Sequence, residues 1–245
     1  MCLTAIENIN WFNGKKEAIT FLRQLNMMMS ILIKSTLVMA IVLLSSKAYA
    51  ENHTKLILPF DSTMSKKLQY FYDNFSMING TTEFFLPEEY KTYAKPFNSQ
   101  EATIAVKGQN FGSEFVSSKD KYYELGRFSY KSNLYKLIAY NKIGECDTLL
   151  FNIQINSYDK NNDLVDALLL SSFYGYEEIE RYAHFVIYPD YTINIDNYII
   201  YYYEENEAGI SDIPIQNPKS QLFLNEKYKI ENGKFLLTSR HENSV

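Results

Sequence analysis

Two segments of this chain place tyrosines directly beside carboxylates, over residues 173–180 and 201–207. Tyrosine offers a large contact area at a low entropic cost, and neighbouring acids attract a basic protein. We therefore predict that both segments contact a partner protein. The candidate binding residues are Tyr174, Tyr176, Glu177, Glu178, Tyr202 and Glu205. The alternative is that the tyrosines only pair across strands and cover a sheet.

The same acidic residues have the chemistry of a hydrolase. Glu177, Glu178 and Glu180 are close enough in sequence to include an acid and a base. Three glutamates in a polar loop are more often a solvated edge, and no catalytic motif accompanies them. An envelope hydrolase therefore remains an alternative without assigned catalytic residues, and so does a carbohydrate-binding module that uses exposed tyrosines. We expect no cofactor.

Asp159, Asn161 and Asp163 have the spacing of the oxygen ligands that open a calcium loop. The rest of that pattern fails, because Leu164 replaces the glycine of the sharp turn and Leu170 replaces the bidentate glutamate. A turn between two strands explains the same residues, so we predict no metal site.

Cys146 and His184 could form a thiol nucleophile and its base. No thiol-enzyme signature flanks Cys146, and a lone cysteine entering a strand is usually a small buried hydrophobe. We therefore expect a packing role for Cys146.

Residues 27–50 have the pattern of a cleaved secretory signal peptide. A short basic segment ends at Lys34, an apolar run covers residues 37–44, and Ala48-Tyr49-Ala50 is a sequence that signal peptidase accepts. The apolar run is too short to cross a bilayer, which takes about 20 apolar residues. We therefore predict cleavage after Ala50, no membrane span in the mature protein, and a periplasmic location.

The translation start is open among Met1, Met27, Met28 and Met29. Three consecutive methionines stand directly ahead of the basic segment, so we interpret residues 1–26 as a start-site extension. A genuine leader is the alternative. Residues 51–245 then form a single domain, which is long enough to bury a core.

The predicted mature chain is acidic. Of the 24 basic and 29 acidic residues of the full chain, 19 and 27 lie in residues 51–245, which changes the net charge from −5 to −8. Contact with nucleic acid relies on a basic patch, so this charge argues against a nucleic-acid partner. It suits a basic protein partner.

The elements that must position these residues are mostly strands. Period-two alternation predicts strands, which we place at residues 102–107, 122–130, 134–140, 149–156, 164–171, 181–188, 192–203, 222–230 and 235–238. In residues 149–156 the odd-numbered side chains are apolar and most even-numbered ones are amides, so we expect one face of this strand in water. Short turn signals, such as Asn232-Gly233, separate the strands. A parallel sheet with crossover helices is therefore disfavoured.

Apolar residues at helical spacing predict one amphipathic helix over residues 63–75, and a proline opens a possible second helix over residues 87–93. Residues 204–219 are acidic and then carry two prolines, so we expect a long loop. The fold class is therefore mainly β (α+β): an antiparallel β-meander, or a partly open barrel or sandwich, with one or two N-terminal helices.

Residues 151–173 and 185–195 resemble small exported β-meander proteins of Gram-negative bacteria that lack an assigned activity. The resemblance implies a one-domain, β-rich fold and carries no catalytic residues across. Together with the signal pattern and the acidic surface, it favours a periplasmic, non-enzymatic protein that binds another protein, such as an inhibitor or an immunity protein.

Overall fold

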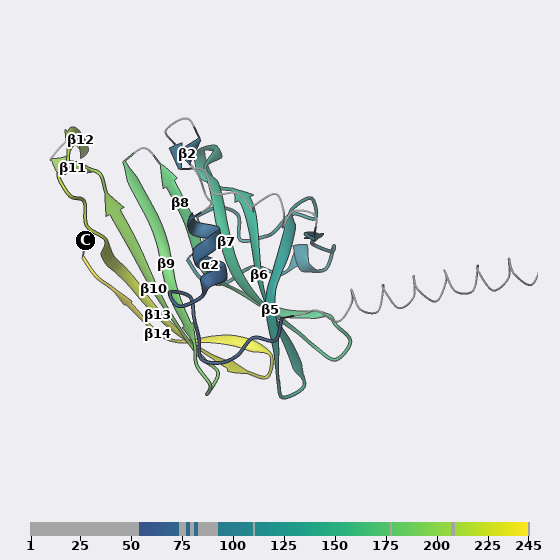
Figure 1. Ribbon diagram of the computed structural model, residues 1–245. Helices are drawn as coiled ribbons and strands as arrows, with labels where there is room; N and C mark the ends of the chain where they lie inside the picture. The colour runs from purple at the N-terminus through teal and green to yellow at the C-terminus, as the bar shows by residue number, and fades with distance from the viewer. Residues whose placement is uncertain are drawn as a thin grey trace, which may run out of the picture. The chain divides into compact units, whose positions relative to one another are not determined.

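A large antiparallel sheet dominates the computed structural model of the chain (Figure 1). The structure describes residues 54–73, 77–78, 81–82, 93–109, 111–176, 178–206 and 209–244. The predicted start-site extension, the signal peptide and nearly all of the second predicted helix lie outside these residues.

The first described elements are short: β1 (Phe60–Asp61), α2 (Lys66–Asp73), β2 (Met77–Ile78), β3 (Thr81–Thr82), β4 (Lys95–Pro96) and the 3₁₀ turn η1 (Glu101–Thr103). The long strands follow: β5 (Lys121–Tyr130), β6 (Asn133–Ile143), β7 (Leu149–Tyr158), β8 (Leu164–Tyr176), β9 (Ile179–Ile187), β10 (Thr192–Tyr201), β13 (Gln221–Glu231) and β14 (Lys234–Glu242). A second 3₁₀ turn, η2 (Glu145–Asp147), lies between β6 and β7. The main strand order is β14-β13-β10-β9-β8-β7-β6-β5-β4, and all neighbouring strands in this order are antiparallel.

This order confirms the predicted antiparallel fold, and turn chemistry explains it. Asn232 and Gly233 have φ values of 51° and 80°, the left-handed conformation that a two-residue hairpin needs at both positions. A side chain at Gly233 would also meet the amide nitrogen of Asn133 at 2.7 Å. Asn162 has a φ of 64° in the turn between β7 and β8. The strands are therefore joined by tight turns that leave no room for crossover helices.

The sheet divides between β8 and β9. These strands pair only through residues 174–176 of β8. Earlier in β8, Lys107 takes the place of β9: its N–H donates to the carbonyl of Ala167 over 3.0 Å, and its carbonyl accepts from Leu169 over 2.8 Å. Strand β1 fills the corresponding place beside β9. The sheet therefore has two halves joined where β8 turns into β9. One half contains β4–β8, and the other contains β9, β10, β13 and β14.

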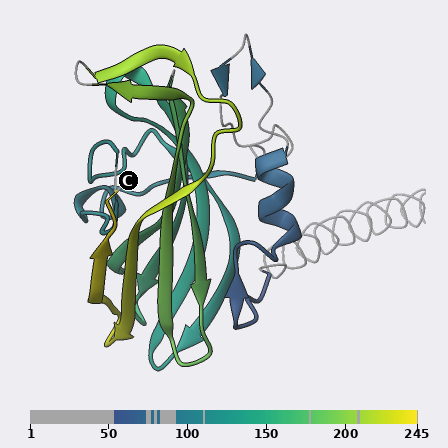
Figure 2. The ribbon, with the colours of Figure 1, turned by 90° about the vertical axis from the view of Figure 1, so that its left-hand side faces the viewer.

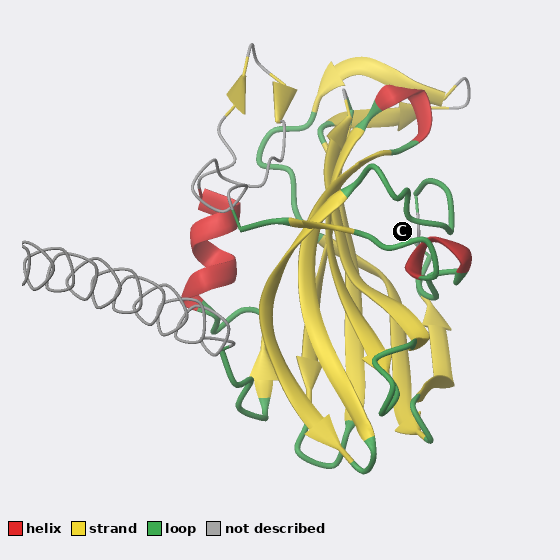
Figure 3. Cartoon of the chain, turned by 90° about the vertical axis from the view of Figure 1, so that its right-hand side faces the viewer, coloured by secondary structure: helices red, strands yellow, loops and turns green. Residues whose placement is uncertain are grey.

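The main hydrophobic core combines residues from both halves, including Phe151 and Ile153 of β7 and Phe185 of β9. Helix α2 adds Phe71 to this core, where its ring meets the ring of Phe151 edge-on at 6.1 Å. The predicted helix is thus confirmed over a shorter span, and Figure 3 shows it as the longest described helix, beside the strands.

The even-numbered face of β7 is buried, so the prediction that water covers it is wrong. Residues 97–116 pack over this side, and the side chains of Asn152, Gln154 and Asn156 are at most 1% exposed. A chain of hydrogen bonds satisfies much of this face. It runs from Tyr140 through Gln154, Asn156 and Tyr158 to Glu101, with donor–acceptor distances of 2.7, 2.6, 3.1 and 2.5 Å.

Two other predictions are also wrong. Residues 102–107 were predicted as a strand, but η1 occupies their start, because Asn98 and Glu101 cap each other's backbone N–H over 2.8 Å in both directions. The predicted long loop contains a hairpin of β11 (Tyr203–Asn206) and β12 (Gly209–Pro214). Its strands are too short and too acidic for the alternation pattern to reveal them.

Candidate functional site

The two tyrosine–glutamate segments meet at Tyr202. Its backbone N–H donates to the carbonyl of Glu178 over 2.8 Å, and its hydroxyl donates to the Glu180 carboxylate over 3.1 Å. We call residues 174–181 and 202–214 together the acidic end. Where the structure describes their side chains, these ranges contain four acidic residues, Glu178, Glu180, Glu204 and Asp212, and one basic residue, Arg181. The structure therefore joins the segments that the sequence predicted separately.

A groove of about 370 Å³ at the acidic end is lined by Glu178, Tyr203, Ser211 and Asp212. Figure 2 shows the β11–β12 hairpin, which supplies three of these residues, crossing the end of the sheet. Two carboxylates from different segments thus border one groove beside an aromatic ring. The sequence prediction missed Asp212, because only the hairpin pairing brings it near Glu178.

A smaller pocket of about 160 Å³ contains two of the predicted residues. Its lining includes Phe111, Glu145, Thr148, Leu150, Tyr174 and Tyr176. The Phe111 and Tyr174 rings meet edge-on with centroids 4.9 Å apart. Burial raises the pKa of Tyr174, the positive charge of Arg181 lowers it, and the negative charge of Glu145 raises it. The pocket is therefore aromatic, with one charge of each sign near it.

Burial also shifts the pKa values of Glu180 and Tyr202, which form the contact at Tyr202. It raises the pKa of Glu180, although the hydrogen bond from Tyr202 opposes this effect. Burial and the Glu180 carboxylate together raise the pKa of Tyr202 to about 12. Tyr202 therefore keeps its proton at neutral pH and acts as a donor that fixes Glu180.

The remaining predicted residues are only partly described. Glu177 lies outside the described residues. Glu205 pairs through its backbone with Ile210 in the β11–β12 hairpin.

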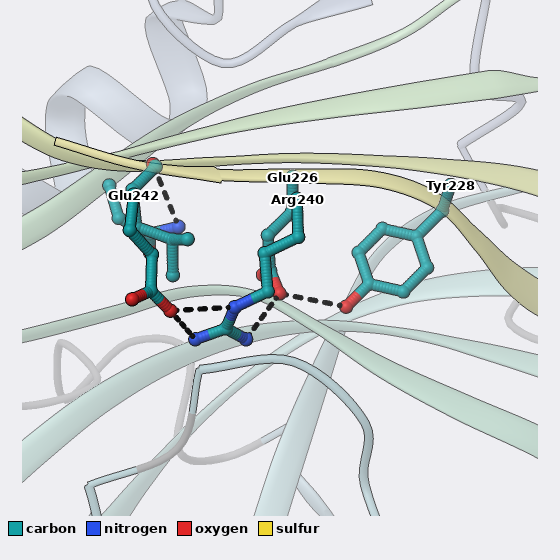
Figure 4. A network of polar contacts seen from close by, with 6 residues as sticks. Glu226, Tyr228, Arg240 and Glu242 are labelled. Atoms are coloured by element: carbon teal, nitrogen blue, oxygen red, sulfur yellow. Dashed lines mark hydrogen bonds and ion pairs between the residues drawn. The ribbon is translucent and has the colours of Figure 1, made fainter.

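A second polar network lies on β13 and β14, outside the predicted segments. The carboxylate of Glu226 accepts from Arg240 over 3.0 Å and from the Tyr228 hydroxyl over 3.3 Å. Arg240 also donates to Glu242 over 3.0 Å. Figure 4 shows these side chains on one side of the strands, with Arg240 between the two carboxylates. Arg240 is paired with both carboxylates, so we interpret the network as one that stabilises the pairing of β13 with β14.

The residues of the partial calcium-loop pattern and His184 have local structural roles, whereas the side chain of Cys146 lies outside the described part of the structure. Asp159 caps the β7–β8 turn by accepting from Asn161 and Asp163 over 2.8 and 3.0 Å. His184 packs against the rings of Tyr182 and Tyr198, each with a centroid distance of 5.2 Å. Within the described ranges, no group of three or more His, Cys, Asp or Glu residues is placed to hold a metal ion.

Among the described helices, none is both long and apolar enough to cross a membrane. The chain was also compared with known proteins. No family model, curated protein or solved structure matched it.

Proposed function

We propose that this chain is an exported, periplasmic and non-enzymatic protein that binds a basic partner protein at its acidic end, as an inhibitor or immunity protein does. The observation that carries the proposal is the groove in which Glu178 and Asp212 border Tyr203. The signal pattern of residues 27–50 supports export.

The chemistry of the groove favours a lysine or arginine side chain from the partner. Two carboxylates can pair with the cationic head, while an aromatic ring contacts the apolar stem or the cation itself. The four described acidic residues of this end create a negative electrostatic potential that speeds the approach of a basic protein. Because Tyr202 ties the two segments together, part of this surface is ordered before binding.

Affinity capture from periplasmic extract at low salt tests the proposal. The unchanged protein should retain a stoichiometric basic protein, and the double variant Glu178→Gln/Asp212→Asn should bind it at least about tenfold more weakly, since each lost charge pair weakens the complex. Calorimetry with the purified partner measures this difference, and affinity should fall as salt rises.

The matched control is Asp163→Asn/Glu231→Gln, which changes the net charge equally but away from the acidic end. The control should bind normally. Equal weakening in both double variants would show that only net charge matters, and failure to retain any stoichiometric partner would refute the proposed function.

The hydrolase alternative gains one specific observation, because Glu178 and Asp212 border the same groove. If the chain hydrolyses an envelope substrate, Glu178→Gln should abolish turnover with little change in stability. Unchanged turnover in that variant would remove this alternative. Binding to a glycan array tests the carbohydrate-binding alternative in the same way.

A further inference from the structure

Arg181 on β9 contacts two aromatic rings. Its guanidinium carbon lies 4.8 Å from the ring centroid of Phe111 and 5.2 Å from that of Phe223. These two cation–π contacts, which we call the clamp, restrict the planar group. Because Phe111 and Phe223 come from segments far apart in the sequence, the clamp forms only in the folded chain.

Arg181 also differs from the other arginines in the described residues. Arg127 pairs with Glu124 over 2.5 Å, and Arg240 pairs with Glu226 over 3.0 Å. No ion pair or hydrogen bond of the Arg181 guanidinium occurs within the described part of the chain, and its buried Nε lacks a partner. A buried donor without an acceptor is costly, and two aromatic rings hold this guanidinium in place, so Arg181 is suited to bind an anion.

The small aromatic pocket adjoins this clamp. Phe111 belongs to both, and Tyr174, which lines the pocket, is directly opposite Arg181 in the pairing of β8 with β9. The pocket's volume of about 160 Å³ is smaller than the roughly 300–1,000 Å³ of sites for drug-sized ligands. It therefore suits a compact apolar group attached to the anion.

A carboxylate fits this environment better than a phosphate. The guanidinium fork matches the two oxygens of a planar carboxylate, and a single negative charge is repelled less by the surrounding acids than a double one. Glu145 on the pocket wall adds to that repulsion.

We propose that Arg181, clamped by Phe111 and Phe223, binds the carboxylate of a small ligand or chain end whose compact apolar body fills the pocket beside Tyr174 and Tyr176. This carboxylate site uses Tyr174, Tyr176 and Arg181 of the acidic end, but it shares no lining residue with the groove at Glu178 and Asp212. It does not depend on the proposed basic partner.

Titration calorimetry with benzoate and its uncharged analogue benzamide tests this site on the full chain. Benzoate should bind in the millimolar range expected for a fragment, at least about tenfold more tightly than benzamide. Arg181→Gln should abolish this preference. Arg181→Lys should recover only part of it, because lysine keeps the charge but lacks the planar fork.

Lys160→Gln is the matched control, since it removes one positive charge from the exposed β7–β8 turn. It should leave the preference unchanged. Phe223→Leu keeps the apolar packing and removes one side of the clamp, so it should weaken benzoate binding even if Arg181→Gln folds poorly. Equal binding of benzoate and benzamide, no binding of benzoate, or tighter binding of inorganic phosphate would each overturn the proposal.

Discussion

Glu226 shows how one residue can make folding depend on pH. Its side chain is 1% exposed, whereas its partner Arg240 is 42% exposed. Burial raises the pKa of Glu226, and Arg240 only partly offsets this effect. An acid with a raised pKa in the folded protein binds its proton more tightly there than in the unfolded chain. Its ionisation therefore works against folding as the pH rises from about 4.5.

We expect the variant Glu226→Gln, which mimics the protonated acid, to gain stability relative to the unchanged protein between pH 4 and pH 7. Urea unfolding at both pH values measures the two free energies. Glu231→Gln is the control. Lys229 lowers the pKa of exposed Glu231, so this variant should lose stability relative to the unchanged protein as the pH rises over the same range. A constant difference between Glu226→Gln and the unchanged protein across this range would contradict the argument.

At the scale of elements, Asp166 holds the two halves of the sheet together. This buried carboxylate on β8 accepts from the Lys107 ammonium over 2.6 Å and from the backbone N–H of Phe235 on β14 over 2.8 Å. The same ammonium also donates to the carbonyl of Phe235 over 2.9 Å. One side chain thus ties the start of the last strand to a strand from the other half.

We expect Asp166→Ala to lower the free energy of unfolding by about 2–4 kcal/mol, since it leaves a buried N–H without an acceptor and Lys107 without its partner. Asp166→Asn keeps an acceptor and should cost less, about 1 kcal/mol. Exposed Asp163→Ala should stay within about 0.5 kcal/mol in the same urea titration. If Asp166→Ala also changed the free energy of unfolding by no more than about 0.5 kcal/mol, the contact would not hold the two halves together.

Sequence patterns predicted the elements better than their surroundings. Alternation identified the long strands because each has one apolar face toward the core. It assigned the amide face of β7 to water, because covering by residues 97–116 leaves no periodic signal in β7 itself. The sequence also predicted Glu178 and Tyr202 as site residues. It missed Asp212 and the Phe111–Arg181 contact, since these depend on distant segments meeting.

At the scale of the whole molecule, the proposed export signal determines where the mature protein begins. If residues 27–50 are a cleaved signal, the mature protein starts at Glu51 and has a net charge of −8. Mass spectrometry of the protein purified from periplasm should find Glu51 first. A variant with Ala48→Leu and Ala50→Leu should remain uncleaved, because large residues block signal peptidase. Residue 1 found intact on the exported protein would refute the interpretation.

The amide face of β7 has a consequence for local motion. Residues 97–116 bury Phe97, Val106 and Val116 in a second apolar cluster that is separate from the main core and smaller than it. The same layer covers Asn152, Gln154 and Asn156, which water can satisfy as hydrogen-bonding groups. Lifting this layer exposes the smaller cluster but not the main core, so we expect it to detach at a lower free energy than the sheet needs to unfold. The molecule thus combines a durable sheet with a cover that can open separately.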